Sequence, residues 1–257
     1  MRIIILSLTV SGTLFTVTLS AETRVLDRYI PNDAFGTGEW FQYSIGYGII
    51  DAGSATMEVQ KFVEVKGRPV YQIRTVATSN RVFDAFYPVR DTMYSLIDAE
   101  GIFSWRFEKH QHEGDYHRSQ EVQFDQMAGY ALEGKDTILI PKYVQDVLSA
   151  FYFIRTQTLN VGDTLRLPNM TDKMSYEMQV IVHAKESIST PAGDFDCLKV
   201  EPILLATGIF RNKGKIYVWL TDDRLHMPVL VRSKIIVGSI HAELTAYRFG
   251  ELWEDQR

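Results

Sequence analysis

The sequence predicts an all-β protein, an antiparallel meander that forms a barrel or a strongly curled sheet, with one principal α-helix. From Glu39 onward, short segments in which apolar and polar residues alternate follow one another, which is the period of a half-buried strand. Turn-forming pairs such as Lys66-Gly67 and Gly114-Asp115 separate these segments. Parallel strands would each need a long crossover connection, and only one segment has helical periodicity.

The composition is that of a soluble globular protein. The chain has 257 residues, of which 46% are hydrophobic and 23% charged, and these values exclude disorder. Its net charge of −5 argues against nucleic acid as a partner. The single cysteine, Cys197, excludes an intrachain disulfide, and its place in a predicted strand indicates a small buried hydrophobe.

The N-terminal segment has the features of a secretory signal peptide. Arg2 provides a positive start, residues 3–19 are mostly apolar, and Ser20 and Ala21 are small enough for cleavage. Several serines and threonines dilute the apolar run, which makes it a poor membrane span. We therefore expect residues 1–21 to be removed on export to the periplasm or cell envelope, with no transmembrane span remaining.

After cleavage, residues 22–38 form a short leader and residues 39–257 a single β-rich domain. A division near Pro141 is the alternative. Strands begin where Phe41, Tyr43, Ile45 and Tyr47 alternate with polar or small residues. Residues 82–86 interrupt the strand pattern and predict a single helical turn.

The principal helix is predicted over residues 145–157. Val147, Leu148, Phe151 and Ile154 recur at helical spacing, and Asp146 precedes them as the N-cap. The apolar stripe of this helix must be buried, and the sheet is the only large partner available.

Histidines cluster on one predicted hairpin. With a two-residue turn at Gly114-Asp115, His112 pairs with His117 and His110 with Ser119, so that three imidazoles share a face. Such a face has ligands suited to a divalent ion. The opposite face is apolar, however, which is typical of a half-buried hairpin with a solvated side. We favour that interpretation and assign no metal site and no cofactor.

The C-terminal strands present a second group of polar and aromatic side chains. A turn at Val237-Gly238 would pair Lys234 with His241 and Arg232 with Glu243. The candidate ligand-binding residues are Tyr217, Trp219, Arg232, Lys234, His241 and Glu243. The alternative is a solvent-facing ladder of ion pairs, which contribute little to stability.

Known catalytic signatures are absent from the sequence, including the nucleophile elbow, the zinc-protease motif, the phosphate-binding loop and the dinucleotide fingerprint. This does not exclude catalysis, because catalytic residues assemble in space rather than in sequence. No catalytic residue is assigned.

Several stretches, taken together, resemble a known family. They are residues 43–48, 52–59, 82–91, 146–152, 190–195 and 218–223, followed by Pro228. The set resembles the bacterial exported family catalogued as domain of unknown function 3108, from about Glu39 to Gly250. The resemblance implies an exported envelope protein with a β-rich fold, and it implies no activity.

These observations favour a non-catalytic envelope protein that binds or carries an apolar or amphipathic ligand, such as a lipid. The basis is the predicted export, a curled sheet, and a helix whose Phe151 and Phe153 can cover a cavity. Two alternatives remain open. One is an envelope hydrolase with a spatially assembled site, and the other is a structural partner in an envelope complex.

Overall fold

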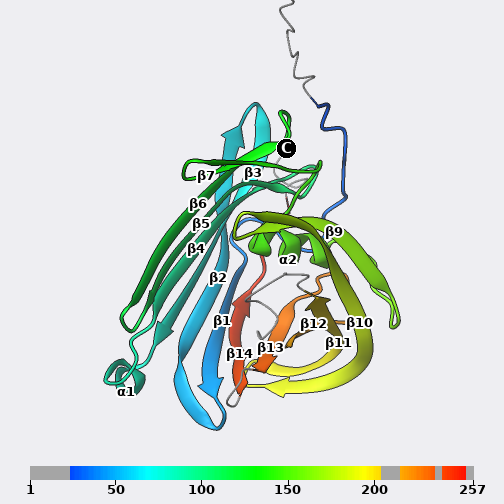
Figure 1. The fold of residues 1–257 in the computed structure, drawn as a ribbon. Helices are drawn as coiled ribbons and strands as arrows, with labels where there is room; N and C mark the ends of the chain where they lie inside the picture. Colours follow the sequence, from blue (N-terminus) through cyan, green and yellow to red (C-terminus); the bar gives the residue numbers. More distant parts are fainter. Residues whose placement is uncertain (1–23, 204–214, 235–238, 253–257) are drawn as a thin grey trace, which may run out of the picture.

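The described chain forms one antiparallel sheet of 14 strands together with two helices (Figure 1). The structure is a computed structural model, and it describes residues 24–203, 215–234 and 239–252, so the predicted signal peptide lies outside it. The elements are β1 (Trp40–Tyr47), β2 (Ile50–Val65), β3 (Arg68–Ser79), α1 (Arg81–Asp84), β4 (Arg90–Asp98), β5 (Ser104–Glu113), β6 (Tyr116–Asp125), β7 (Tyr130–Glu133), β8 (Asp136–Leu139), α2 (Val147–Arg155), β9 (Thr164–Thr171), β10 (Met174–Thr190), β11 (Gly193–Ile203), β12 (Ile216–Thr221), β13 (Pro228–Lys234) and β14 (Ser239–Arg248).

The sheet is a meander whose first and last strands are neighbours. Its order runs from β8 back to β1. The next strand is β14, and the order then runs back from β14 to β9. The predicted all-β antiparallel architecture is thus confirmed. The sheet is curled rather than closed into a barrel, because β8 and β9 stand at its two ends and are not paired with each other.

The opening between β8 and β9 is crossed by the segment that leads into α2. Gln145 forms a parallel bridge with Asn169 of β9, through hydrogen bonds of 2.9 and 2.8 Å to neighbouring backbone groups. An exposed ion pair of 2.5 Å between Lys173 and Asp136 also joins the two ends of the sheet. The connecting chain therefore covers backbone groups on β9 that would otherwise form an open edge.

Helix α2 lies within the predicted range and begins where expected. The Asp146 carboxylate accepts hydrogen bonds from the backbone N–H groups of Leu148 and Ser149, and the Ser149 hydroxyl accepts from the Asp146 N–H. This is a reciprocal cap, which satisfies donors that a helix start leaves free. The same carboxylate accepts the hydroxyl protons of Ser95 and Ser104 at 2.6 Å, so the cap also attaches the helix to β4 and β5.

Two opposite faces of α2 are buried, one against each half of the sheet. Leu148 and Tyr152 belong to a core with the leader and strands β2 to β7. Ala150 and Ile154 belong to a second core with strands β9 to β12. Residues two apart point about 200° apart on a helix, so this alternation places α2 between the two halves.

A buried ion pair holds the C-terminal end of α2. The Arg155 guanidinium donates two hydrogen bonds of 2.7 Å to Glu39, and both side chains are almost fully buried. It also donates to the carbonyl oxygens of Ala34 and Leu225. Burial alone would lower the pKa of Arg155, but the Glu39 carboxylate outweighs burial, and the pKa is raised.

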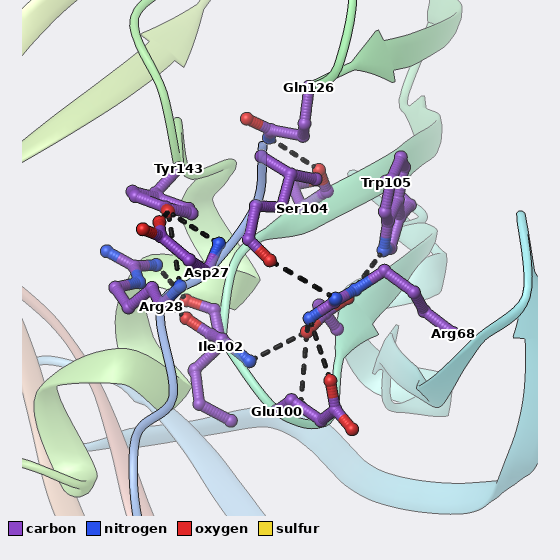
Figure 2. Close-up of polar contacts among 12 residues, drawn as sticks. Asp27, Arg28, Arg68, Glu100, Ile102, Ser104, Trp105, Gln126 and Tyr143 are labelled. Atoms are coloured by element: carbon purple, nitrogen blue, oxygen red, sulfur yellow. Dashed lines mark hydrogen bonds and ion pairs between the residues drawn. The ribbon is translucent and has the colours of Figure 1, made fainter. Parts of the chain in front are cut away.

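The leader is attached to the turn between β4 and β5 by a polar cluster (Figure 2). Arg28 donates to the carbonyl oxygens of Gly101 and Ile102 and lies 4.2 Å from the centre of the Tyr143 ring. Burial lowers the pKa of Arg28 to about 10.

In the same cluster, the buried Asp98 carboxylate accepts from Arg68 at 2.5 and 2.9 Å and from the Trp105 indole at 3.1 Å. It also accepts from the backbone N–H groups of Glu100 and Gly101. Since Asp98 is matched by its partners within the fold, we assign this cluster a structural role.

Candidate functional site

An apolar cavity of about 180 Å³ lies between α2 and strands β9 to β12. Its lining consists of Val147, Ala150, Phe151, Ile154, Asn169, Thr171, Met178, Val180, Val200, Pro202, Ile216, Val218 and Leu220. None of these side chains is charged. An engineered apolar cavity of about 150 Å³ is known to bind benzene, so this volume accommodates one ring or a short run of methylene groups.

The cavity results from the size of the side chains that face the helix. Ala150 is the smallest residue on this face of α2, and it lies opposite the valines of neighbouring strands. In the sheet, Val200 pairs with Val218, so these two short side chains stand together on the cavity wall. Short side chains on both layers leave space that the packing does not fill.

The polar groups of the lining are already engaged with one another. The Asn169 amide donates to the Asp146 carbonyl at 3.4 Å, and the Thr171 hydroxyl donates to the Asn169 side-chain oxygen at 3.1 Å. A bound group would therefore gain few hydrogen bonds inside the cavity. The cavity is suited to an uncharged apolar group and unsuited to a charged one, because burying an unpaired charge is costly.

The sequence-predicted ligand residues lie on β12, β13 and β14, with a register that differs from the prediction. Arg232 pairs with His241, Leu230 with Glu243 and Lys234 with Ser239. The predicted pairing of Lys234 with His241 and of Arg232 with Glu243 is wrong, because four residues rather than two separate the paired strands. Those four, 235–238, include the expected turn and lie outside the described residues.

The predicted grouping of these residues nevertheless holds in part, because a shift of two residues keeps each side chain on its face. Tyr217 pairs with Arg232, and Arg232 with His241, so the three share a face. The Arg232 guanidinium lies 5.6 Å from the Trp219 ring centre, and His241 lies 3.9 Å from Glu243. The side chain of Lys234 is not among those described.

We call this group of polar and aromatic side chains the polar ladder. Two further residues belong to it that were not predicted. The Trp219 indole donates to Glu186 at 2.7 Å, and Lys199 donates to the other oxygen of the same carboxylate. The hydrogen bond from Trp219 and the charge of Lys199 lower the pKa of Glu186. Lys199 also lies about equally close to the Tyr217 and Trp219 rings, at 4.9 and 5.1 Å. Lys199 pairs with Trp219 across β11 and β12, so a prediction of this strand pairing would have placed Lys199 in the group.

The cavity and the ladder occupy opposite faces of the same strand. Along β12, Ile216, Val218 and Leu220 line the cavity, whereas Tyr217 and Trp219 alternate with them and point to the other side. The predicted ligand residues are thus brought close to one another and separated from the cavity by the thickness of the sheet.

A larger surface depression, of about 490 Å³, lies beside β6 and β7. Ser119, Gln120, Glu121, Gln123, Leu132, Glu133, Gly134 and Lys173 line it. Two of its charged groups are paired within the fold, Glu121 with Arg106 and Lys173 with Asp136, and one oxygen of Glu133 accepts from Gln120. We consider the cavity beside α2 the better ligand site because it is apolar and less open to solvent than the depression.

The histidine hairpin has the predicted register. His112 pairs with His117 and His110 with Ser119, and the His112 and His117 ring centres are 4.0 Å apart. Within the described ranges, no three histidine, cysteine or carboxylate side chains are grouped as metal ligands. The two imidazoles are exposed at the end of a hairpin.

Cys197 is fully buried, as predicted for a small hydrophobe. Burial raises the pKa of its thiol to about 12, which leaves almost no thiolate at neutral pH. The described structure therefore gives this cysteine no nucleophilic role.

These features define a class of protein: a curled, open antiparallel sheet that encloses a helix and an apolar cavity. Residues 42–245 match the model of the family described as "Protein of unknown function (DUF3108)", and the chain belongs to this family. No curated protein matches the sequence. In the described ranges, neither helix combines the length and apolar character needed to cross a membrane.

Several solved structures are similar to this chain at low sequence identity. A beta-barrel-like protein of the DUF1849 family from Brucella abortus matches with a TM-score of 0.55 and 11% identity, over 87% of this chain and 99% of that one. A candidate lipoprotein from Parabacteroides distasonis matches with a TM-score of 0.35 and 13% identity, over 86% and 100% of the two chains. A candidate exported protein with a YmcC-like fold from Bacteroides fragilis matches with a TM-score of 0.31 and 17% identity, over 86% and 99%. The first likeness supports the barrel-like fold and leaves function open.

Proposed function

We propose that this protein is exported to the cell envelope and binds an apolar or amphipathic ligand without catalysis. The observation that carries the proposal is the partly open apolar cavity between α2 and strands β9 to β12. The signal-like sequence of residues 1–21 supports export, and the exported family that the motifs resemble supports the periplasm or envelope as the compartment.

The cavity constrains the ligand by size and charge. With about 180 Å³ of space and no charged lining, it would take an uncharged ring or the end of an acyl chain. Any charged head group would remain outside, because nothing in the lining compensates its charge. A lipid or a similar amphipathic small molecule meets both conditions.

The direct test is native mass spectrometry of the mature protein purified from its own periplasm, followed by lipid extraction. We expect a near-stoichiometric added mass and its recovery in the organic phase. A clean unliganded mass under gentle conditions would contradict tight binding.

A matched pair of variants tests whether the cavity is the site. Ala150→Leu places extra side-chain volume in the cavity, and Ala184→Leu adds the same volume on β10 outside the lining. With toluene as probe, whose single ring the cavity can hold, isothermal titration calorimetry should show binding about tenfold weaker for Ala150→Leu, whereas Ala184→Leu should bind like wild type. Equal binding by both variants would exclude the cavity as the site.

The polar ladder remains a second candidate site, for a polar ligand or head group. It is favoured by the exposed Arg232 above the Trp219 ring, next to His241 and Glu243. If a co-purified ligand has an anionic head, Arg232→Ala should reduce its retention. Retention equal to wild type would leave the ladder as a set of surface ion pairs.

A further inference from the structure

One end of the sheet carries a concentration of exposed apolar side chains, which we call the apolar tip. It comprises Ile49 and Ile50 at the β1–β2 turn, Val82, Phe86 and Tyr87 in and after α1, and Tyr116 at the β5–β6 turn. Ile49 is completely exposed and Phe86 is 85% exposed. Figure 1 shows α1 and the β1–β2 turn at the foot of the molecule, away from the leader.

The three segments of the apolar tip are joined by hydrogen bonds and form one surface. The Asn80 side chain donates to the Asp51 carbonyl at 2.7 Å, and its backbone N–H donates to Ala52, which connects α1 to the β1–β2 turn. Gly114 donates to the Pro88 carbonyl at 2.8 Å, which connects α1 to the β5–β6 turn. Apolar residues gathered in this way mark an interaction surface, unlike isolated ones.

Several polar groups of α1 and of the residues that follow it have partners inside the protein. The Asn80 side-chain oxygen accepts from the N–H groups of Val82 and Phe83 at 3.0 Å, and the N–H groups of Phe86 and Tyr87 donate to Phe83. Asp84 accepts from both terminal nitrogens of Arg90 and from the Ser79 hydroxyl. These hydrogen bonds lower the pKa of Asp84 to about 2, so the pair remains ionised and matched.

We propose that the apolar tip docks this protein on a lipid surface by inserting these side chains among the acyl chains. Hydrocarbon offers no hydrogen bonds, so an inserted segment must satisfy its polar groups internally, and the capped turn of α1 and the Asp84–Arg90 pair meet this requirement. The side chains also project from three separate turns, which suits penetration of a soft interface. The exposed Arg81 and Asp115 flank the apolar tip and would remain at the level of the head groups. This proposal does not depend on the cavity.

The test is co-flotation of the mature full chain with vesicles of phosphatidylethanolamine and phosphatidylglycerol. The variant Ile49→Ser/Phe86→Ser removes the two most exposed apolar side chains of the tip. The matched control Leu139→Ser/Val161→Ser removes two exposed apolar side chains elsewhere. Because all four residues are exposed, thermal unfolding should confirm that both variants fold like wild type.

We expect wild type and control to float, and the tip variant to lose vesicle partitioning by about tenfold or more. Binding should persist in high salt, which screens exposed charges and leaves apolar insertion intact. Failure of wild type to float, or equal flotation by the tip variant, would overturn the proposal. So would self-association of the wild-type chain that the tip variant abolishes without vesicle binding, since the occupant would then be a second copy.

Discussion

The two faces of α2 meet cores of different character, although both belong to one sheet. On the first face, Tyr152 packs edge-on against Phe35, with 4.6 Å between the ring centres. The ring centres of Phe35 and Tyr71 are 5.1 Å apart. On the second face, Ala150 and Ile154 meet aliphatic side chains and leave a cavity of about 180 Å³. Interlocking rings fill the space on one side, whereas short side chains leave it open on the other. The size of the side chains therefore accounts for the cavity in the half that contains β9 to β12.

The largest loss of stability is expected when the C-terminal end of α2 loses its buried ion pair. Glu39→Ala leaves the Arg155 guanidinium buried without its charge partner, and it should lower the free energy of unfolding by about 3–5 kcal/mol. Urea denaturation of both proteins measures the difference. As a control, Asp136→Ala removes the exposed partner of Lys173 and should cost about 0–1 kcal/mol. Similar losses for the two variants would contradict a structural role for the buried pair.

The difference between the two cores can be tested by adding the same volume to each. Ala131→Leu introduces a larger side chain into the aromatic core, where Ala131 is fully buried, and should destabilise by about 1–3 kcal/mol. Ala150→Leu fills part of the cavity and should leave stability unchanged or raise it by about 0.5–2 kcal/mol. Thermal denaturation compares them. Equal destabilisation would mean that both cores are equally full.

The smallest expected effect concerns the cap that attaches α2 to the first half. Burial raises the pKa of Asp146 above its usual value of 3.8, despite the hydrogen bonds that the carboxylate accepts. The folded protein therefore holds this proton more tightly than the unfolded chain. The group's contribution to stability is present below pH 3.8 and is lost as pH rises through the raised pKa.

Asp146→Asn removes this titration while keeping a residue that caps helices well. As pH rises from 3.8, the free energy of unfolding of wild type should therefore fall relative to that of the variant, by about 1.4 kcal/mol for each unit of pKa shift. Denaturation at a series of pH values measures it. A difference that does not change with pH would show that the Asp146 pKa is unperturbed.

Features set by neighbouring residues could be predicted from the sequence. Asp146 marks the start of α2, and Gly114, with a φ of +58°, allows the tight turn that sets the register of the histidine hairpin. The predicted register between β13 and β14 was wrong because a two-residue turn was assumed, whereas four residues separate the paired strands. Both the pairing of β1 with β14 and the cavity depend on contacts between distant segments, which no local pattern encodes.

The pairing of β1 with β14 has a consequence for the order of folding. Arg248 donates to the Gly38 carbonyl across 210 positions, and β14 is the strand that links the two halves of the sheet. Contacts between such distant positions form slowly, because closing a long loop costs entropy before the contact is made. Each half can begin to assemble from local hairpins, but they become one sheet only after the final strand is available. If the chain is exported from its N-terminus, as we propose, β14 emerges after both halves of the sheet, and until then the edges of β1 and β13 are open to mispairing.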